Sequence, residues 1–204
     1  MNRTQLEELD RPAAARSADA VEDRSVDARA GVAVEYRSVA AADCDAMVSF
    51  LTGLSLRTRF LRFFAPASPP SPAVLRAMCG GGRTTDAIVA THDGVIVGHG
   101  MAADSVSPEG CLVSDIGVVV ADRWQSQGIG SRVLDQVVAR AMARGVSVLV
   151  MDVLPENKQM LAMISRRWAD AGYRFAGDAV TARVYLPGVP RAKGGCGGAD
   201  LRAA

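Results

Sequence analysis

The sequence predicts a single α/β domain between residues 31 and 186. Two patterns indicate this class: runs that alternate apolar and polar residues and are rich in β-branched side chains, and segments whose apolar residues recur at helical spacing. The third observation is size and composition. With 49% hydrophobic and 22% charged residues in the whole chain, the central stretch of about 155 residues suffices for one packed core but not for two ordinary domains.

The first predicted elements are one strand and three short helices. Residues 31–39 alternate as a half-buried strand does, and residues 42–54 bring their large apolar side chains to one helical face. Ser55 is suited to cap a second helix, and Pro72 fits the first turn of a third. These two helices are expected at residues 56–64 and 73–79.

A hairpin and a further strand follow. Residues 86–105 contain two alternating runs that meet at Asp93 and Gly94, a dipeptide typical of tight hairpin turns. Residues 111–120 then form another run of apolar and β-branched residues, which predicts the next strand.

The last part of the predicted domain alternates helices with strands. Apolar residues recur at helical spacing over residues 131–144, and residues 146–153 form a short apolar strand that we expect to be buried. A second helix is expected over residues 156–171, ending at Gly172. Residues 179–187 alternate again and predict the final strand.

The two ends of the chain are not expected to join this domain. Residues 1–30 lack a sustained apolar face and predict a disordered arm, whereas residues 187–204 are rich in Gly and Ala and predict a flexible tail. A net charge of +1 excludes a strongly basic nucleic-acid binder. Because the sequence has neither an apolar stretch of about 20 residues nor a signal-peptide core, we expect no membrane contact and a cytoplasmic location.

Cysteine and histidine are too few and too scattered to predict a metal site. Both histidines, His92 and His99, lie on predicted strands. The spacing of the cysteines fits neither a zinc site nor a CxxC redox pair, so we expect free thiols. The four cysteines are Cys44, Cys79, Cys111 and Cys196.

The most informative segment, residues 118–134, joins an apolar strand to an amphipathic helix through a loop with two glycines. Such a loop presents backbone N–H groups at a helix N-terminus, where they can bind phosphate. A Walker A loop is disfavoured because no lysine follows Gly130. A Rossmann fingerprint is closer, since Gly128 lies two residues before Gly130 and Asp152 ends the next strand. It lacks the third glycine, which is Val133 here, and the tight turn after the strand.

The third interpretation of this loop is QxxGxG, which residues 125–130 match. On these residues and their place between strand and helix, the chain resembles the GCN5-related N-acetyltransferases (GNAT) from about Val32 to Leu186. The resemblance implies a GNAT domain over residues 31–186, with acetyl-CoA as cosubstrate. It also implies a mixed, mostly antiparallel sheet of about six to seven strands, with helices on both faces and a splay between strands 4 and 5.

Three segments resemble more narrowly the acetyltransferase domain of bacterial protein lysine acetyltransferases. They are residues 54–64 (LSLRTRFLRFF), 122–130 (DRWQSQGIG) and 155–161 (PENKQML). For residues 56–64 the alternative is an ordinary amphipathic helix, with Phe and Leu in the core and the arginines in water.

The resemblance implies that the loop wraps the pyrophosphate of acetyl-CoA and that the edge of strand 111–120 pairs with its pantetheine arm. Gly117 in that strand leaves two alternatives, a β-bulge that opens the splay or the relief of crowding. Ser126 stands where related enzymes often have Gly, and Gln127 where Arg is common. The predicted cofactor-binding residues are Val118, Val119, Val120, Gln125, Ser126, Gln127, Gly128, Ile129, Gly130, Ser131 and Asn157.

Asp115 occupies the position at which the related lysine acetyltransferases carry a catalytic Glu. A lysine-like amine with a pKa of about 10.4 is mostly protonated at neutral pH, so a base or a water relay assists its attack. Asp is one methylene shorter than Glu, and we therefore expect transfer through water. The alternative for Asp115 is a structural carboxylate. The Tyr that often protonates the leaving thiolate has no counterpart in residues 156–171, so the general acid stays unassigned.

The function implied by this resemblance is acetyl transfer from acetyl-CoA directly to a primary amine, most of all a protein lysine. One alternative is a small amine: an amino acid, a polyamine or an aminoglycoside. Another alternative is a regulatory module that binds acyl-CoA without catalysis, for which the missing Tyr is the support. A monomer or a homodimer is expected.

Overall fold

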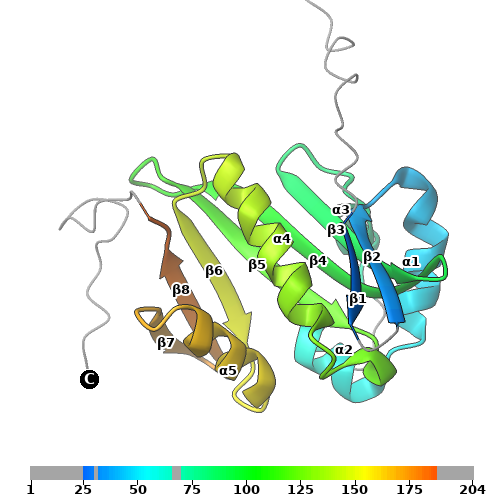
Figure 1. Ribbon diagram of the computed structural model, residues 1–204. Coiled ribbons are helices and arrows are strands. Elements are labelled where there is room, and N and C mark those ends of the chain that lie inside the picture. Colours follow the sequence, from blue (N-terminus) through cyan, green and yellow to red (C-terminus); the bar gives the residue numbers. More distant parts are fainter. Residues whose placement is uncertain (1–24, 30–31, 66–69, 188–204) are drawn as a thin grey trace, which may run out of the picture.

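An eight-stranded sheet forms the centre of the structure, a computed structural model that describes residues 25–29, 32–65 and 70–187 (Figure 1). The strand order is β1-β2-β3-β4-β5-β6-β8-β7, and among these strands only β5 and β6 pair in parallel. The predicted mixed, mostly antiparallel sheet is thus confirmed. The strands are β1 Ser25–Arg29, β2 Val32–Ser38, β3 Thr85–His92, β4 Val95–Val106, β5 Leu112–Val120, β6 Val148–Val153, β7 Gly172–Ala176 and β8 Ala179–Tyr185.

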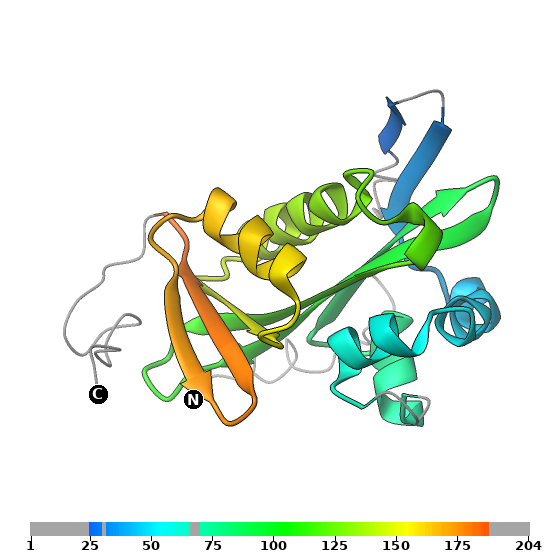
Figure 2. The ribbon, with the colours of Figure 1, turned by 90° about the horizontal axis from the view of Figure 1, so that it is seen from below.

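Helices cover both faces of the sheet, as predicted. Figure 2 shows α4 and α5 on one side and α1, α2 and α3 on the other. None of the helices in the described part of the chain is long and apolar enough to cross a membrane. The helices are α1 Cys44–Thr52, α2 Leu56–Phe63, α3 Pro72–Met78, α4 Ile129–Ala143 and α5 Lys158–Arg167.

Helix α4 buries one face against the sheet because its apolar residues recur every three or four positions. The helix lies so close to β4 that a Cβ on Gly100 would overlap a methyl carbon of Val133. Gly100 therefore allows the close approach that holds the start of α4 beside the end of β5. The buried residues of α4 are Ile129, Val133, Leu134, Val137, Val138 and Ala141.

Strands β5 and β6 separate after a short stretch of pairing. Their parallel ladder joins Val113–Asp115 to Val148–Val150, whereas beyond Asp115 strand β5 continues to Val120 paired only with β4. This is the predicted splay between strands 4 and 5, counted without β1, and it is confirmed. The β4–β5 register runs unbroken through Gly117, opposite Met101. Gly117 therefore forms no β-bulge.

Two strands of the sheet were not predicted. Ser25–Arg29 pair with β2, although residues 1–30 were expected to form a disordered arm. The other residues of that arm, and residues 188–204 of the predicted tail, lie outside the described residues. Strand β7 is the second addition, and it pairs with β8 at the far edge of the sheet.

The predicted helix over residues 156–171 is shorter in the structure and ends at Arg167. Trp168 leaves the helical conformation, with φ −132° and ψ 89°, and packs against the main core. Gly172, the expected helix stop, instead begins β7.

The cysteines follow the prediction in part. Cys44 and Cys79 carry free thiols. Cys111 is disulfide-bonded, so the expectation of a free thiol is wrong for this residue. Cys196 lies outside the described residues.

Candidate active site

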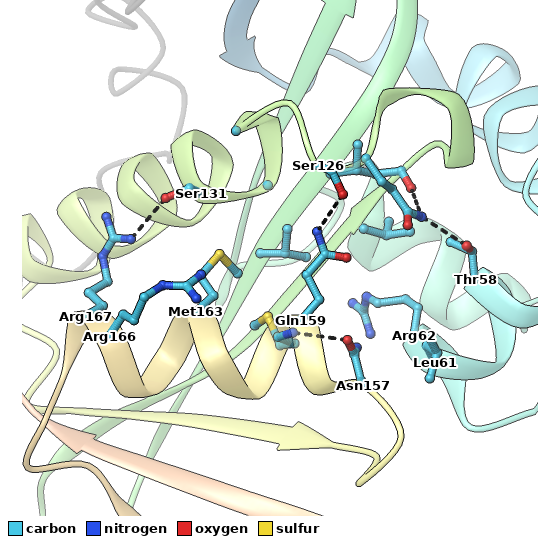
Figure 3. Close-up of a pocket in the computed structure, with 17 residues that line it drawn as sticks. Thr58, Leu61, Arg62, Ser126, Ser131, Asn157, Gln159, Met163, Arg166 and Arg167 are labelled. Atoms are coloured by element: carbon cyan, nitrogen blue, oxygen red, sulfur yellow. Dashed lines mark hydrogen bonds between the residues drawn. The ribbon is translucent and has the colours of Figure 1, made fainter.

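A cavity of about 610 Å³ opens where β5 and β6 separate (Figure 3). Its walls come from the free edge of β5, the loop that leads into α4, one face of α5 and helix α2. The lining residues are Thr58, Leu61, Arg62, Val118, Val119, Val120, Gln125, Ser126, Gly128, Gly130, Ser131, Asn157, Gln159, Met160, Met163, Arg166 and Arg167.

The structure brings nine of the eleven predicted cofactor-binding residues to this cavity. The two others lie outside its lining. Gln127 is exposed and donates a hydrogen bond to the Arg123 carbonyl oxygen at 2.9 Å, while Ile129 is only 4% exposed and belongs to the main core. The nine that line the cavity are Val118, Val119, Val120, Gln125, Ser126, Gly128, Gly130, Ser131 and Asn157.

The loop before α4 turns through two left-handed residues. Gly128 has φ 85°, which glycine adopts without steric cost, whereas Ser126 at φ 61° adopts a conformation that L-residues disfavour. The turn aims the first N–H groups of α4 at the cavity, where they lack intrahelical acceptors and where the helix dipole favours negative charge. The loop can therefore bind a phosphate group.

Helix α5 contributes a second set of cavity residues, which sequence reasoning missed. Arg166 and Arg167 lie at its C-terminal end and line the cavity. Arg167 forms an ion pair with Asp135 and donates a hydrogen bond to the Ser131 hydroxyl at 3.3 Å. Position 127, where related enzymes commonly have Arg, is an uncharged Gln here, and Arg166 and Arg167 supply positive charge to the cavity instead. Their spacing from Met160 and Met163 along one helix face was the available signal.

A carboxylate ties helix α2 to the cofactor loop. Asp122 accepts hydrogen bonds from the Ser55 backbone N–H at 2.9 Å, the Ser55 hydroxyl at 2.6 Å and the Thr58 hydroxyl at 2.7 Å. Burial alone would raise the pKa of Asp122, but the bonds from Ser55 and Thr58 outweigh it and lower that pKa. Gln125 in turn donates to the Thr58 hydroxyl and to the Val120 carbonyl oxygen, each at 3.1 Å. The start of α2 is thus held beside the loop.

A second cavity of about 230 Å³ adjoins the first and holds two carboxylates, Asp115 and Asp152. Burial raises the pKa of Asp115, the nearby charge of Asp152 raises it further, and Arg183 opposes this. Asp152 accepts a hydrogen bond from the Thr181 hydroxyl at 2.6 Å. The remaining walls are largely apolar, and they are formed by Phe64, Met101, Ala103, Ile116, Gly117 and Val150, together with Arg62.

Arg62 lines both cavities, so it lies where they meet. Its Nε is buried without a hydrogen-bond partner, and its guanidinium carbon lies 5.1 Å from the centre of the Phe63 ring. Burial lowers the pKa of Arg62 to about 10, so the side chain is charged at neutral pH. A Cβ on Gly117 would lie 2.5 Å from the guanidinium carbon. Gly117 thus relieves crowding by Arg62, and the alternative in which all arginines of this helix face water does not hold for Arg62.

The model of the acetyltransferase (GNAT) family matches residues 55–167, more than half of the chain. The chain belongs to this family. The match contains α2, β5, the cofactor loop, α4 and α5, which are the elements that build the larger cavity. The chain is therefore an N-acetyltransferase with acetyl-CoA as its cosubstrate.

Solved structures of other GNAT proteins share the fold. The GNAT domain of PAT from S. lividans is 21% identical, with a TM-score of 0.70 over 80% of this chain and 97% of that one. An acetyltransferase from Salmonella typhimurium with its cofactor acetyl-CoA is 16% identical, with a TM-score of 0.55 over 75% and 94%. An aminoglycoside acetyltransferase from a soil metagenomic sample is also 16% identical, with a TM-score of 0.56 over 70% and 92%. None of the curated proteins compared with this GNAT chain matches it.

Proposed function

We propose that this GNAT enzyme transfers the acetyl group of acetyl-CoA to the side-chain amine of a protein lysine. The observation that carries the proposal is the junction of the two cavities at the splay. One cavity has a phosphate-binding loop, and the other has an apolar wall and two carboxylates. A thioester that enters from the first cavity would meet an amine that enters from the second, which supplies the proximity that the reaction needs.

The lining of the larger cavity supports a binding mode for acetyl-CoA. The backbone N–H groups around Gly128 and Gly130 would hold the pyrophosphate, and Arg166 and Arg167 would add charge-assisted contacts to phosphate. The free edge of β5 offers main-chain groups to the amides of the pantetheine arm, as a sheet edge does to an added strand. Asn157 also caps α5, because its side-chain oxygen accepts the Met160 N–H at 3.2 Å. Because Asn157 also lines the cavity, its amide nitrogen would donate to the cofactor.

Asp115 is the proposed base. It lies two residues before Gly117 on the same strand, at the point where the β5–β6 ladder ends, so it faces the junction. Its raised pKa makes the carboxylate a better proton acceptor than an ordinary Asp. The incoming ammonium would give a proton through water to Asp115, and the neutral amine would then attack. Asp152 would attract the ammonium before this proton transfer.

The proposal of a lysine acceptor rests on two supports. The sequence resembles protein lysine acetyltransferases in three segments, and PAT from S. lividans, whose GNAT domain shares the fold, is a protein acetyltransferase. The smaller cavity agrees with it, since Met101, Ala103 and Val150 suit an alkyl chain and the carboxylates suit its ammonium. A small amine is the second candidate, supported by the aminoglycoside acetyltransferase that shares the fold.

The test is a panel of lysine peptides, amino acids, polyamines and aminoglycosides, each incubated with enzyme and acetyl-CoA. Thiol release and cofactor binding are recorded together. We expect release with lysine peptides. Release with small amines alone would transfer the assignment to the second candidate, and cofactor binding without release across the panel would favour a regulatory module.

The role of Asp152 has its own test. Asp152→Asn keeps an oxygen for the Thr181 hydroxyl but removes the charge, so we expect the KM of the acceptor to rise roughly fivefold to tenfold. Affinity for acetyl-CoA should stay unchanged. Asp93→Asn, which removes the same charge from an exposed hairpin turn, is the matched control. Equal KM values in both variants would contradict the role of Asp152.

A further inference from the structure

A half-buried cation, Arg62, lies at the meeting point of the two cavities. Among the described residues, Arg62 alone lines both of them, and its side chain points from α2 into the larger cavity (Figure 3). If the thioester and the acceptor amine occupy the two cavities, the reacting atoms must come together beside this side chain. The position of Arg62 therefore calls for a chemical explanation.

Arg62 has no ionic partner among the described residues. Asp115 lines the same small cavity, yet the two side chains form no ion pair, and the Nε of Arg62 is buried without an acceptor. The charge is kept although burial disfavours it. A cation that is partly removed from water and has no partner is destabilising, and a ligand that supplies an oxygen would relieve this. The aromatic contact with Phe63 compensates for only a small part of this cost.

The guanidinium of Arg62 lies over the middle of β5, in space that a side chain at position 117 would occupy. Gly117 has no side chain, and any Cβ there would overlap the guanidinium of Arg62. The neighbouring histidine does not compete for the same ligand as a second cation. Burial lowers the pKa of His99 to about 3, with a further contribution from the charge of Arg62, so the imidazole is neutral. His99 uses its Nε2 to contact the Met78 carbonyl oxygen at 3.0 Å.

We propose that Arg62 donates a hydrogen bond to the carbonyl oxygen of the acetyl thioester and stabilises the negative charge that develops on this oxygen. The proposal rests on the proposed function. When the amine nitrogen attacks the carbonyl carbon, a C–N bond forms and the π electrons of the carbonyl move to oxygen, next to the guanidinium. The carbonyl then re-forms, the C–S bond breaks, and the thiolate leaves with the electron pair. Asp115 has already taken one proton from the ammonium through water before the attack. The nitrogen loses its second proton to solvent water as the amide forms, and the thiolate takes a proton from solvent.

Two variants on one helix test this role. Arg62→Met removes the donor, and Arg57→Met removes an exposed arginine of α2 that lines neither cavity. We expect Arg62→Met to lower kcat by roughly 10² to 10³, the effect typical of losing one oxyanion donor, with the KM of acetyl-CoA changed less than severalfold. Arg57→Met should behave as wild type. A kcat for Arg62→Met within a fewfold of that control would overturn the proposal.

A binding measurement separates this role from a structural one. Wild type should bind acetyl-CoA more tightly than S-ethyl-CoA, a thioether that lacks the thioester carbonyl oxygen, and Arg62→Met should lose this preference. Calorimetry reports it even if no acceptor is found, so a failure of the proposed function and a failure of this inference are distinguishable. Equal preferences in wild type and variant would refute it.

Two further readouts cover the other outcomes. Arg62→Lys retains the charge and serves if Arg62→Met does not fold, and it should keep more kcat than Arg62→Ala. Millimolar guanidinium should restore part of the kcat of Arg62→Ala, and an absence of restoration counts against the proposal. If Arg62→Met instead raises only the KM of acceptors that carry a carboxylate, Arg62 binds the acceptor and the proposal is wrong.

Discussion

Replacing Gly130 by Ala should separate the stability of the protein from its affinity for acetyl-CoA. Gly130 is the second residue of α4, and a Cβ there would meet a single neighbour, a Val120 methyl carbon at 3.4 Å. The apoprotein can therefore accept the methyl group. Because Ala favours helix over Gly by up to about 1 kcal/mol, the melting temperature should rise by up to roughly 4 °C.

The same methyl group points to the surface on which we place the pyrophosphate. Moving the phosphate away from the N-terminus of α4 would cost about one charge-assisted hydrogen bond, or roughly 1.5 to 3 kcal/mol. The Kd of acetyl-CoA should then rise by roughly 10- to 100-fold. Thermal melting without ligand and isothermal calorimetry with acetyl-CoA measure the two effects.

Gly53→Ala is the matched control for this experiment. Gly53 ends α1 with φ −74°, and an added Cβ would meet only backbone oxygens at 3.4 and 3.5 Å. It lies outside both cavities. We expect acetyl-CoA affinity to be unchanged in this variant. If Gly130→Ala binds acetyl-CoA within twofold of wild type, the pyrophosphate does not lie on this helix N-terminus and the reasoning is refuted.

Three further predictions concern other parts of the molecule. Asp115→Ala should lower kcat by roughly 10² to 10⁴ without changing acetyl-CoA affinity, and activity retained within a fewfold would remove Asp115 from the mechanism. Gly100→Ala should lower the free energy of unfolding by about 1 to 3 kcal/mol in denaturant titrations, because the new Cβ would overlap Val133 of α4. An unchanged midpoint would show that the helix can shift. Burial would raise the pKa of Asp104, but the hydrogen bonds and charge of Arg144 lower that pKa overall. The contribution of Asp104 to stability is therefore complete above the unfolded pKa of about 3.9, and it is lost as the pH falls through the lower folded pKa. Asp104→Asn should reduce that loss of stability in acid titrations, and identical acid profiles would argue against the contribution.

Local patterns predicted the loop and the helix that follows it. Gly128 and the apolar stripe of α4 are readable within a few residues, because φ preferences and helical spacing are local properties. Local patterns could not decide between the two alternatives at Gly117, a β-bulge or the relief of crowding. Only the fold shows that Arg62, distant in sequence, occupies the space above this glycine.

The parts that were missed depend on tertiary packing or on an edge position. The register of α5 decides whether Arg166 faces solvent or the cavity, and the sequence of the helix alone does not state where the cavity lies. Strand β7 is an edge strand whose Phe175 is 77% exposed, so it lacks the burial pattern by which strands are recognised. The order of the strands along the chain followed from the local patterns and the splay from the resemblance, whereas the pairing partners of the strands required the structure.

The short pairing of β5 with β6 divides the sheet into two parts. Strands β1 to β5 form one part and β6 to β8 the other, and only three residue pairs of the described strands connect the two backbones. A cosubstrate in the larger cavity would contact β5 on one side of this opening and α5, which follows β6 in the chain, on the other. Amide hydrogen exchange along β6 and β8 should therefore slow on cosubstrate binding, and the bound molecule then acts as an internal brace of the sheet as well as a reactant.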